Sequence, residues 1–79
     1  MTIKINIIKA ETGYDYRNDN SEKIVATVRE GRNKPNIYLW RIINGESGFH
    51  NLAGAKYMVE ELLAQRASNL GCDIEFINL

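Results

Sequence analysis

Hydrophobic and polar residues alternate along three segments of the chain, 2–10, 23–29 and 72–78. Alternation places the hydrophobic side chains on one face and is typical of a strand with one buried side. A fourth segment, 36–43, combines aliphatic residues with a tyrosine and a tryptophan, all of which are common in strands. The hydrophobic pattern therefore predicts four strands.

The spacing of apolar residues changes after Asn51 and follows a period of three to four residues. That spacing is typical of one face of an amphipathic helix. Asn51 is suited to capping the first turn, and Gly71 can adopt the left-handed conformation that ends many helices. We therefore predict a helix from Leu52 to Leu70. One helical stripe contains Leu52, Ala55, Val59, Leu62, Leu63, Arg66 and Leu70. We expect Val59, Leu62, Leu63 and Leu70 in this stripe to be buried against the sheet.

The segments between these elements are rich in residues that favour turns. Residues 11–22 contain no aliphatic side chain and are dense in Gly, Asn, Asp and Ser, so we expect a long loop there. Gly31 and Pro35 bracket a predicted hairpin turn. The Asn, Gly and Ser of residues 44–48 predict a further turn before the helix.

These elements predict a single α+β domain over residues 1–79 with the order β-β-β-α-β. The simplest arrangement is a mostly antiparallel four-stranded sheet with the helix packed on one face. When the strands are numbered along the chain, we expect the sheet order 4-1-2-3, with the last strand parallel to the first. One helix covers only one face of such a sheet, so the other face is the informative one for function.

Composition narrows the classes of function. Ten basic and ten acidic residues give a formal net charge of zero, so no global field favours nucleic acid or a membrane surface. A single cysteine excludes an internal disulfide, and with one histidine it cannot build a zinc site. No apolar run approaches the roughly 20 residues of a membrane span. We expect a cytoplasmic protein with no metal, no cofactor and no membrane contact.

Catalytic arrangements are sparse in the sequence. His50 and Cys72 flank the predicted helix at opposite ends and cannot form a nucleophile–base pair. Glu60 and Glu61 are neighbours on that helix and diverge by about 100°, which suits a solvated face better than paired acid–base chemistry. We therefore expect a protein that is not an enzyme.

Residues 36–43 have two apolar faces, and the sequence does not choose which of them is buried. One face carries Ile37, Leu39, Arg41 and Ile43, and the other carries Tyr38, Trp40 and Ile42. In one interpretation Tyr38 and Trp40 face the helix, and the predicted loop at 11–22 partly covers the aliphatic side. In the other interpretation Tyr38 and Trp40 lie on the open face as anchors for a partner protein.

Opposite charges collect in two segments. The predicted hairpin is basic, because a single glutamate offsets its cations. These are Arg29, Arg32, Lys34 and Arg41. The loop at 11–22 is acidic and also holds Tyr14 and Tyr16, which it could display to a partner. Asp15, Arg17 and Asp19 occupy the alternating positions of a calcium loop, but the central one is a cation and the turn glycine is missing. A basic hairpin near aromatic residues could also hold phosphates and stack bases.

With catalysis and metal chemistry disfavoured, we expect a small non-enzymatic protein–protein interaction module. Its partner is expected to be a host or cognate protein, and it could also form a homodimer. The candidate partner-binding residues are Tyr14, Tyr16, Arg29, Arg32, Lys34, Tyr38, Trp40 and Arg41. The alternative function is nucleic-acid binding through the basic hairpin.

Size, layout and residue usage suggest a class for this module. Nine Asn and ten Ile beside a single Pro indicate an A/T-rich coding sequence. A compact chain of this kind is similar in dimensions to small phage or mobile-element inhibitors of host defence, including anti-CRISPR and anti-restriction proteins. Such proteins block a target by occupying its surface. No residue motif carries the likeness, so this expectation rests on size, layout and composition.

Overall fold

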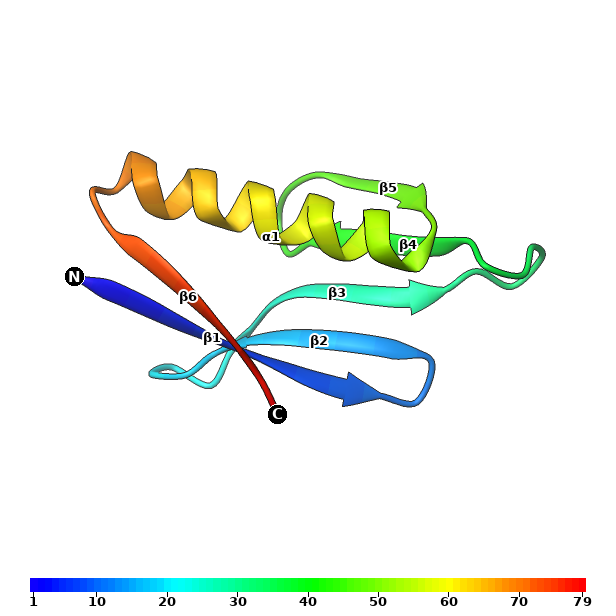
Figure 1. Ribbon diagram of the computed structural model, residues 1–79, viewed down its shortest axis with the longest axis horizontal. Helices are drawn as coiled ribbons and strands as arrows, with labels where there is room; N and C mark the ends of the chain where they lie inside the picture. Colours follow the sequence, from blue (N-terminus) through cyan, green and yellow to red (C-terminus); the bar gives the residue numbers. More distant parts are fainter.

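Six strands and one helix make up the structure, with the helix against one face of a single sheet (Figure 1). The computed structural model describes residues 1–79. The elements are β1 (Thr2–Ala10), β2 (Gly13–Asn18), β3 (Ile24–Glu30), β4 (Tyr38–Ile42), β5 (Ser47–His50), α1 (Leu52–Asn69) and β6 (Asp73–Asn78). The prediction of a single α+β domain with one helix is confirmed.

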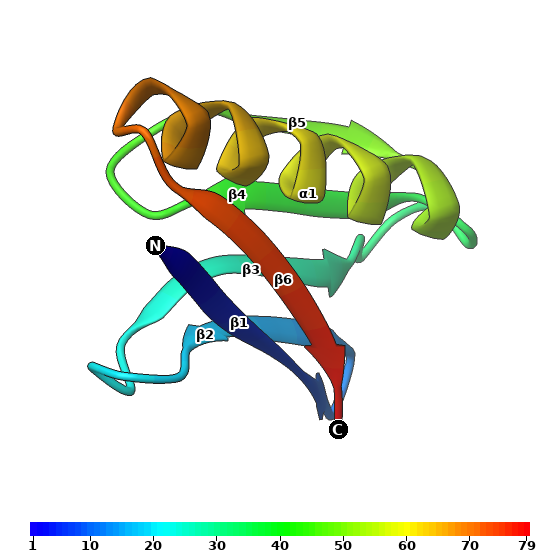
Figure 2. The ribbon, with the colours of Figure 1, turned by 60° about the vertical axis from the view of Figure 1, so that its left-hand side comes forward.

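The strand order in the sheet is β5-β4-β3-β2-β1-β6. Successive strands from β1 to β5 pair antiparallel, so each connection reverses the chain. The chain then passes through α1 to the opposite edge of the sheet, where β6 pairs parallel with β1. The expected parallel pairing of the first and last strands is confirmed. Figure 2 shows α1 lying across the sheet and β6 descending from its C-terminal end.

Two strands are present that the hydrophobic pattern does not predict, so the expectation of four strands in the order 4-1-2-3 is wrong. Residues 11–22, expected to form a loop, include β2, which lies between β1 and β3. Tyr14 and Tyr16 alternate with charged residues and give β2 an apolar face without any aliphatic side chain. Gly13 lets β2 approach β3 closely, because a Cβ atom there would collide with the carbonyl oxygen of Val28.

β5 is the second unpredicted strand, and it begins inside the residues expected to form a turn. The turn is shorter than expected, because the Ile42 amide donates to the carbonyl oxygen of Glu46 at 2.8 Å. Asn44 supplies the positive φ of 59° that this turn needs. Arg66 of α1 donates to Oε1 of Glu46 at 2.7 Å and joins the turn to the helix. Hydrogen bonds from its own backbone amide and from Arg66 lower the pKa of Glu46.

The helix begins and ends close to where its caps predict. The Asn51 side chain accepts a hydrogen bond of 2.7 Å from the Gly54 amide, and Gly71 follows the last turn with a φ of 73°. The helix ends at Asn69, with Leu70 as its C-cap. Leu70 is 77 % exposed, so its predicted place in the buried stripe is wrong. The helix is not long and apolar enough to cross a membrane.

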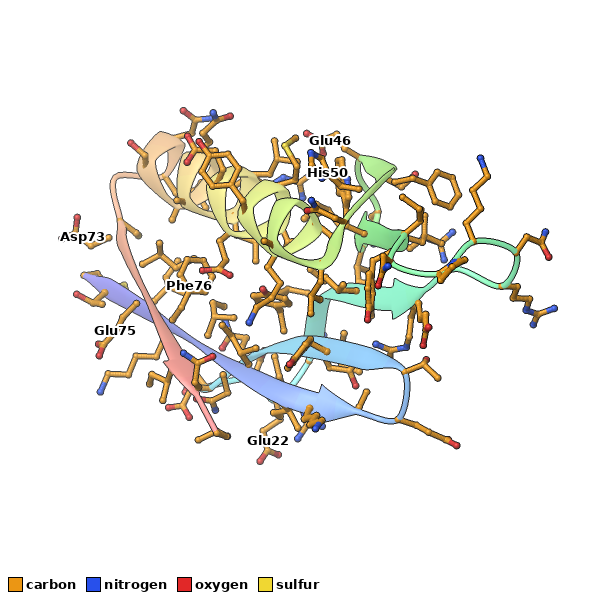
Figure 3. The ribbon with its side chains drawn as sticks, turned by 45° about the vertical axis from the view of Figure 1, so that its right-hand side comes forward. Glu22, Glu46, His50, Asp73, Glu75 and Phe76 are labelled. Atoms are coloured by element: carbon orange, nitrogen blue, oxygen red, sulfur yellow. The ribbon has the colours of Figure 1, made fainter.

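The core lies between the sheet and one side of α1. Ala55, Val59, Leu63 and Ala67 are the buried helix residues. They face the inward side chains of the strands, which include Ile5, Ile7, Tyr16, Ala26, Val28, Trp40 and Ile42. Figure 3 shows Phe76 between β6 and α1, and its ring meets that of Tyr16 edge-on with centroids 6.1 Å apart. The other side of the sheet has no covering element.

Candidate interaction surface

Trp40 lies in the core and not on the open face. It is 7 % exposed and points to the α1 side of the sheet together with Ile42, while Tyr38 is half-buried on the same side. Gly48 on β5 pairs with Trp40 on β4, and a Cβ atom at position 48 would lie 2.9 Å from the indole ring. The glycine therefore makes room for the tryptophan. The interpretation that Tyr38 and Trp40 anchor a partner on an open face is wrong, because the helix covers that face.

Tyr14 and Tyr16 also face the helix instead of being displayed on a loop. The Tyr16 side chain has no exposed surface, and its hydroxyl donates to Oε2 of Glu60 at 2.9 Å. Burial and then the neighbouring Glu60 carboxylate raise the pKa of Tyr16. The ammonium of Lys56 lies 4.5 Å from the centre of the Tyr14 ring. Both tyrosines therefore hold β2 to α1, and the expectation that they are available to a partner is wrong.

The outward face of the sheet carries a second group of apolar side chains. Leu39 on β4 and Phe49 on β5 are direct cross-strand neighbours there. Phe49 is 68 % exposed, and neither residue belongs to the core under α1. Beside them, Ile37 and Phe49 line a hollow of about 460 Å³ together with the β3–β4 loop. An exposed phenylalanine beside a hollow is a feature of interaction surfaces more than of ordinary solvated strands.

Arg32 and Lys34 line this hollow, and Arg29 and Arg41 lie on the outward face of the neighbouring strands. These cations differ in whether the chain already pairs them. Arg29 is bound to the Asp15 carboxylate and donates to the Tyr14 carbonyl oxygen at 2.9 Å, so its charge is compensated internally. Arg32, Lys34 and Arg41 make no ion pair and no hydrogen bond through their side chains. All are exposed. They leave uncompensated positive charge on the outward side of the sheet.

We call this group the hairpin patch. It consists of the apolar residues Ile37, Leu39 and Phe49 and the cations Arg32, Lys34 and Arg41. The structure thus brings part of the basic set predicted from the sequence next to apolar side chains. Phe49 was missed, because its strand follows a run of turn residues and is only four residues long. Residues 47–50 show no alternation of apolar and polar side chains that could have revealed the strand.

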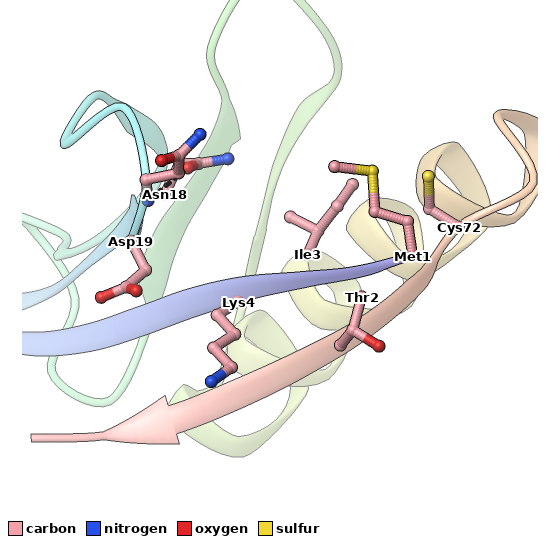
Figure 4. A pocket seen from close by; sticks show the side chains of 8 residues that line it. Met1, Thr2, Ile3, Lys4, Asn18, Asp19 and Cys72 are labelled. Atoms are coloured by element: carbon pink, nitrogen blue, oxygen red, sulfur yellow. Dashed lines mark hydrogen bonds between the residues drawn. The ribbon is translucent and has the colours of Figure 1, made fainter.

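A second hollow lies at the opposite end of the sheet, around the start of β1 (Figure 4). Its volume is about 290 Å³, and its polar groups come mainly from the β2–β3 turn. These groups are largely engaged within the chain. The Asp19 carboxylate accepts from the side-chain Nδ2 of Asn6 at 2.9 Å, and the Asn18 side chain accepts from the backbone amides of Asn20 and Ser21. No group of three or more His, Cys, Asp or Glu side chains gathers here or elsewhere.

Comparisons with protein-family models, with curated proteins and with solved structures find no match for this chain. The geometry and charge of the hairpin patch are therefore the observations on which a function can be based.

Proposed function

We propose that this protein is a non-enzymatic protein-binding module and that the hairpin patch is its contact with an acidic partner protein. The observation that carries the proposal is the exposed ring of Phe49, which lies beside Leu39 and next to cations that have no partner within the chain. Partner binding would bury the ring and pair the charges in one step.

The composition of the patch favours a protein surface as the occupant. Protein interfaces combine an apolar centre that holds aromatic anchors with a polar rim, and arginine is enriched in them. Ile37, Leu39 and Phe49 supply the centre, and Arg32 and Arg41 supply the rim. Because these cations are uncompensated, complementarity requires acidic residues on the partner.

The finer proposal is that the partner is a host defence protein and that this chain is a phage or mobile-element inhibitor acting in the cytoplasm. Support comes from the small size of the domain, its residue usage and the presence of one well-defined patch. An inhibitor that acts by occupying a surface needs little more than a rigid domain that presents such a patch. The strands that carry Leu39 and Phe49 are directly paired, which fixes these two residues of the patch next to each other.

One observation favours nucleic-acid binding as a second candidate. The Phe49 ring lies near Arg32 and Lys34, an arrangement that could stack on a base while the cations contact phosphates. The formal net charge of zero gives no long-range attraction to a polyanion. We therefore place this function second.

The test uses the exposed aromatic residues as a matched pair. Phe49 and Tyr57 have similar exposed fractions, 68 % and 64 %, but Tyr57 is on α1 and faces away from the sheet. Tagged wild-type, Phe49→Ala and Tyr57→Ala proteins are used to capture partners from a bacterial lysate, and the affinity for each identified partner is then measured by calorimetry. We expect Phe49→Ala to weaken binding at least about tenfold, which corresponds to roughly 1.4 kcal/mol, and Tyr57→Ala to leave it unchanged.

A charge reversal at Arg41 provides a second test of the hairpin patch. Arg41→Glu should weaken the same complex, whereas Lys23→Glu should not, because Lys23 precedes β3 at the end far from the β3–β4 loop. A partner whose affinity is insensitive to both Phe49→Ala and Arg41→Glu would show that the patch is not the contact. A loss of about three orders of magnitude in affinity between 50 and 200 mM salt would instead assign nucleic-acid binding.

A further inference from the structure

The outer edge of β6 has free backbone groups that point away from the sheet. The amides of Asp73 and Leu79 donate to carbonyl oxygens of β1 and its flanking residue, at 3.0 and 3.1 Å. In a parallel ladder, alternate residues of a strand bond to the same neighbour. The amide and carbonyl groups of Ile74, Phe76 and Asn78 therefore point to the opposite side, where no further strand is present.

We infer that this edge pairs with the β6 edge of a second copy of the chain. In the complex the two β6 strands run antiparallel about a two-fold axis that passes beside Phe76, and the two sheets become one. Such a contact is isologous, because the same edge is used by both copies. The C-terminal half of β6 lies clear of α1 in Figure 2, which leaves this edge accessible.

Centring the pairing on Phe76 satisfies every free backbone group of the edge. Phe76 lies opposite Phe76 of the second copy, and Ile74 lies opposite Asn78 of the second copy, so each of these residues exchanges both of its hydrogen bonds. On the outward face, Glu75 then lies opposite Ile77 of the second copy. No like charges face each other in this register.

Pairings centred on a neighbouring residue of β6 either bring like charges together or leave a backbone group unpaired. Centring on Glu75 places that carboxylate directly opposite its own copy, and centring on Ile74 places Asp73 opposite Glu75 of the second copy. Like charges directly opposite each other destabilise a strand pair. Centring on Ile77 avoids this but leaves the backbone of Ile74 without a partner. Charge and hydrogen bonding therefore select the register centred on Phe76.

The other edge of the sheet is a weaker candidate for self-pairing. β5 contains only four residues, and its outward backbone groups come from Ser47 and Phe49. The formal net charge of zero means that two copies do not repel each other overall.

Opposite charges at position 77 test the register directly. In the proposed dimer Ile77→Lys would face Glu75 of the second copy, whereas Ile77→Glu would face the same carboxylate with a like charge. Both variants remove the same apolar side chain from the isolated chain. Sedimentation equilibrium on the full chain should show a wild-type dimer. The dimer dissociation constant of Ile77→Glu should exceed that of Ile77→Lys by about tenfold or more, because each pair occurs twice.

The Asn78→Pro variant provides an independent test of the β6–β6 pairing. The Asn78 amide makes no bond within the chain, so proline at this edge position removes only a bond to the second copy. We expect a folded monomer by circular dichroism and sedimentation. Phe49→Ala, which alters the hairpin patch, should leave the dimer intact.

Three results would overturn the inference. The first is a wild-type protein that stays monomeric up to about 1 mM, a range that covers even weak association. The second is a dimer that responds equally to Ile77→Lys and Ile77→Glu. The third is a dimer lost in Phe49→Ala but retained in Asn78→Pro, which would place self-association at the hairpin patch.

Discussion

The hydroxyl of Tyr16 donates a hydrogen bond of 2.9 Å to Oε2 of Glu60 and so joins the middle of the sheet to the helix. Tyr16 has no exposed surface, whereas Glu60 is half-buried. The contact lets the Tyr16 hydroxyl lie in the core with a hydrogen-bond partner, because the Glu60 carboxylate at the edge of the sheet–helix interface accepts its hydrogen bond.

Removal of this hydroxyl should cost a measurable but limited amount of stability. We expect Tyr16→Phe to lower the free energy of unfolding by about 0.5–1.5 kcal/mol, since water can solvate the half-buried Glu60 that loses its donor. Urea denaturation followed by circular dichroism measures this. Tyr57→Phe, at an exposed tyrosine of α1, is the matched control and should show no change. Equal effects in the two variants would contradict the role given to the bond.

The same tyrosine should make stability fall in alkaline solution. Burial and Glu60 raise the pKa of Tyr16 in the folded protein, whereas the unfolded chain releases this proton near the ordinary tyrosine pKa of about 10. Above about pH 10 the folded state therefore holds a proton that the unfolded chain has released. The contribution of Tyr16 to the free energy of unfolding is complete below about pH 10 and is lost as pH rises further. Comparison of wild type with Tyr16→Phe between about pH 8 and 11 isolates this slope. Parallel curves would show that Tyr16 does not contribute to it.

Two leucines of the helical stripe should differ sharply in how much they contribute to stability. Leu63 is 8 % exposed in the core, so Leu63→Ala should cost about 2–5 kcal/mol. Leu70 lies at the C-cap and is largely exposed, so Leu70→Ala should change stability by less than about 0.5 kcal/mol. Thermal melts of both variants provide the comparison. A large loss at Leu70 would mean that the end of the helix packs differently.

Trp40 should behave as a core residue in spectroscopy and in mutagenesis. Its fluorescence should be blue-shifted and protected from aqueous quenchers in the isolated protein, because the indole lies under α1. Trp40→Ala should cost about 3–5 kcal/mol and disrupt folding of so small a domain. For that reason Phe49→Ala, and not Trp40→Ala, is the variant that tests partner binding. A red-shifted, readily quenched spectrum would contradict the placement of Trp40.

Local signals were sufficient for the helix and for the strands with aliphatic residues. Asn51 and Gly71 act at the ends of α1 through their own side chain or backbone, and neither requires the rest of the fold. The alternation of apolar and polar residues in β1, β3 and β6 is likewise a local feature, so these strands could be predicted from the sequence. The parallel placement of β6 beside β1 also followed from the order of the elements.

Tertiary contacts decided the remainder. β2 contains turn-forming residues, yet it becomes a central strand because the backbones of β1 and β3 pair with it and Tyr16 fills the space beneath α1. The two faces of β4 are both apolar, so the sequence determined that the strand forms but could not choose its buried side. That choice depends on which side can place Trp40 over Gly48 and under α1, and it leaves Leu39 and Phe49 on the outward face. The cations of the hairpin patch could be predicted from the local sequence, whereas its apolar residues follow from this packing.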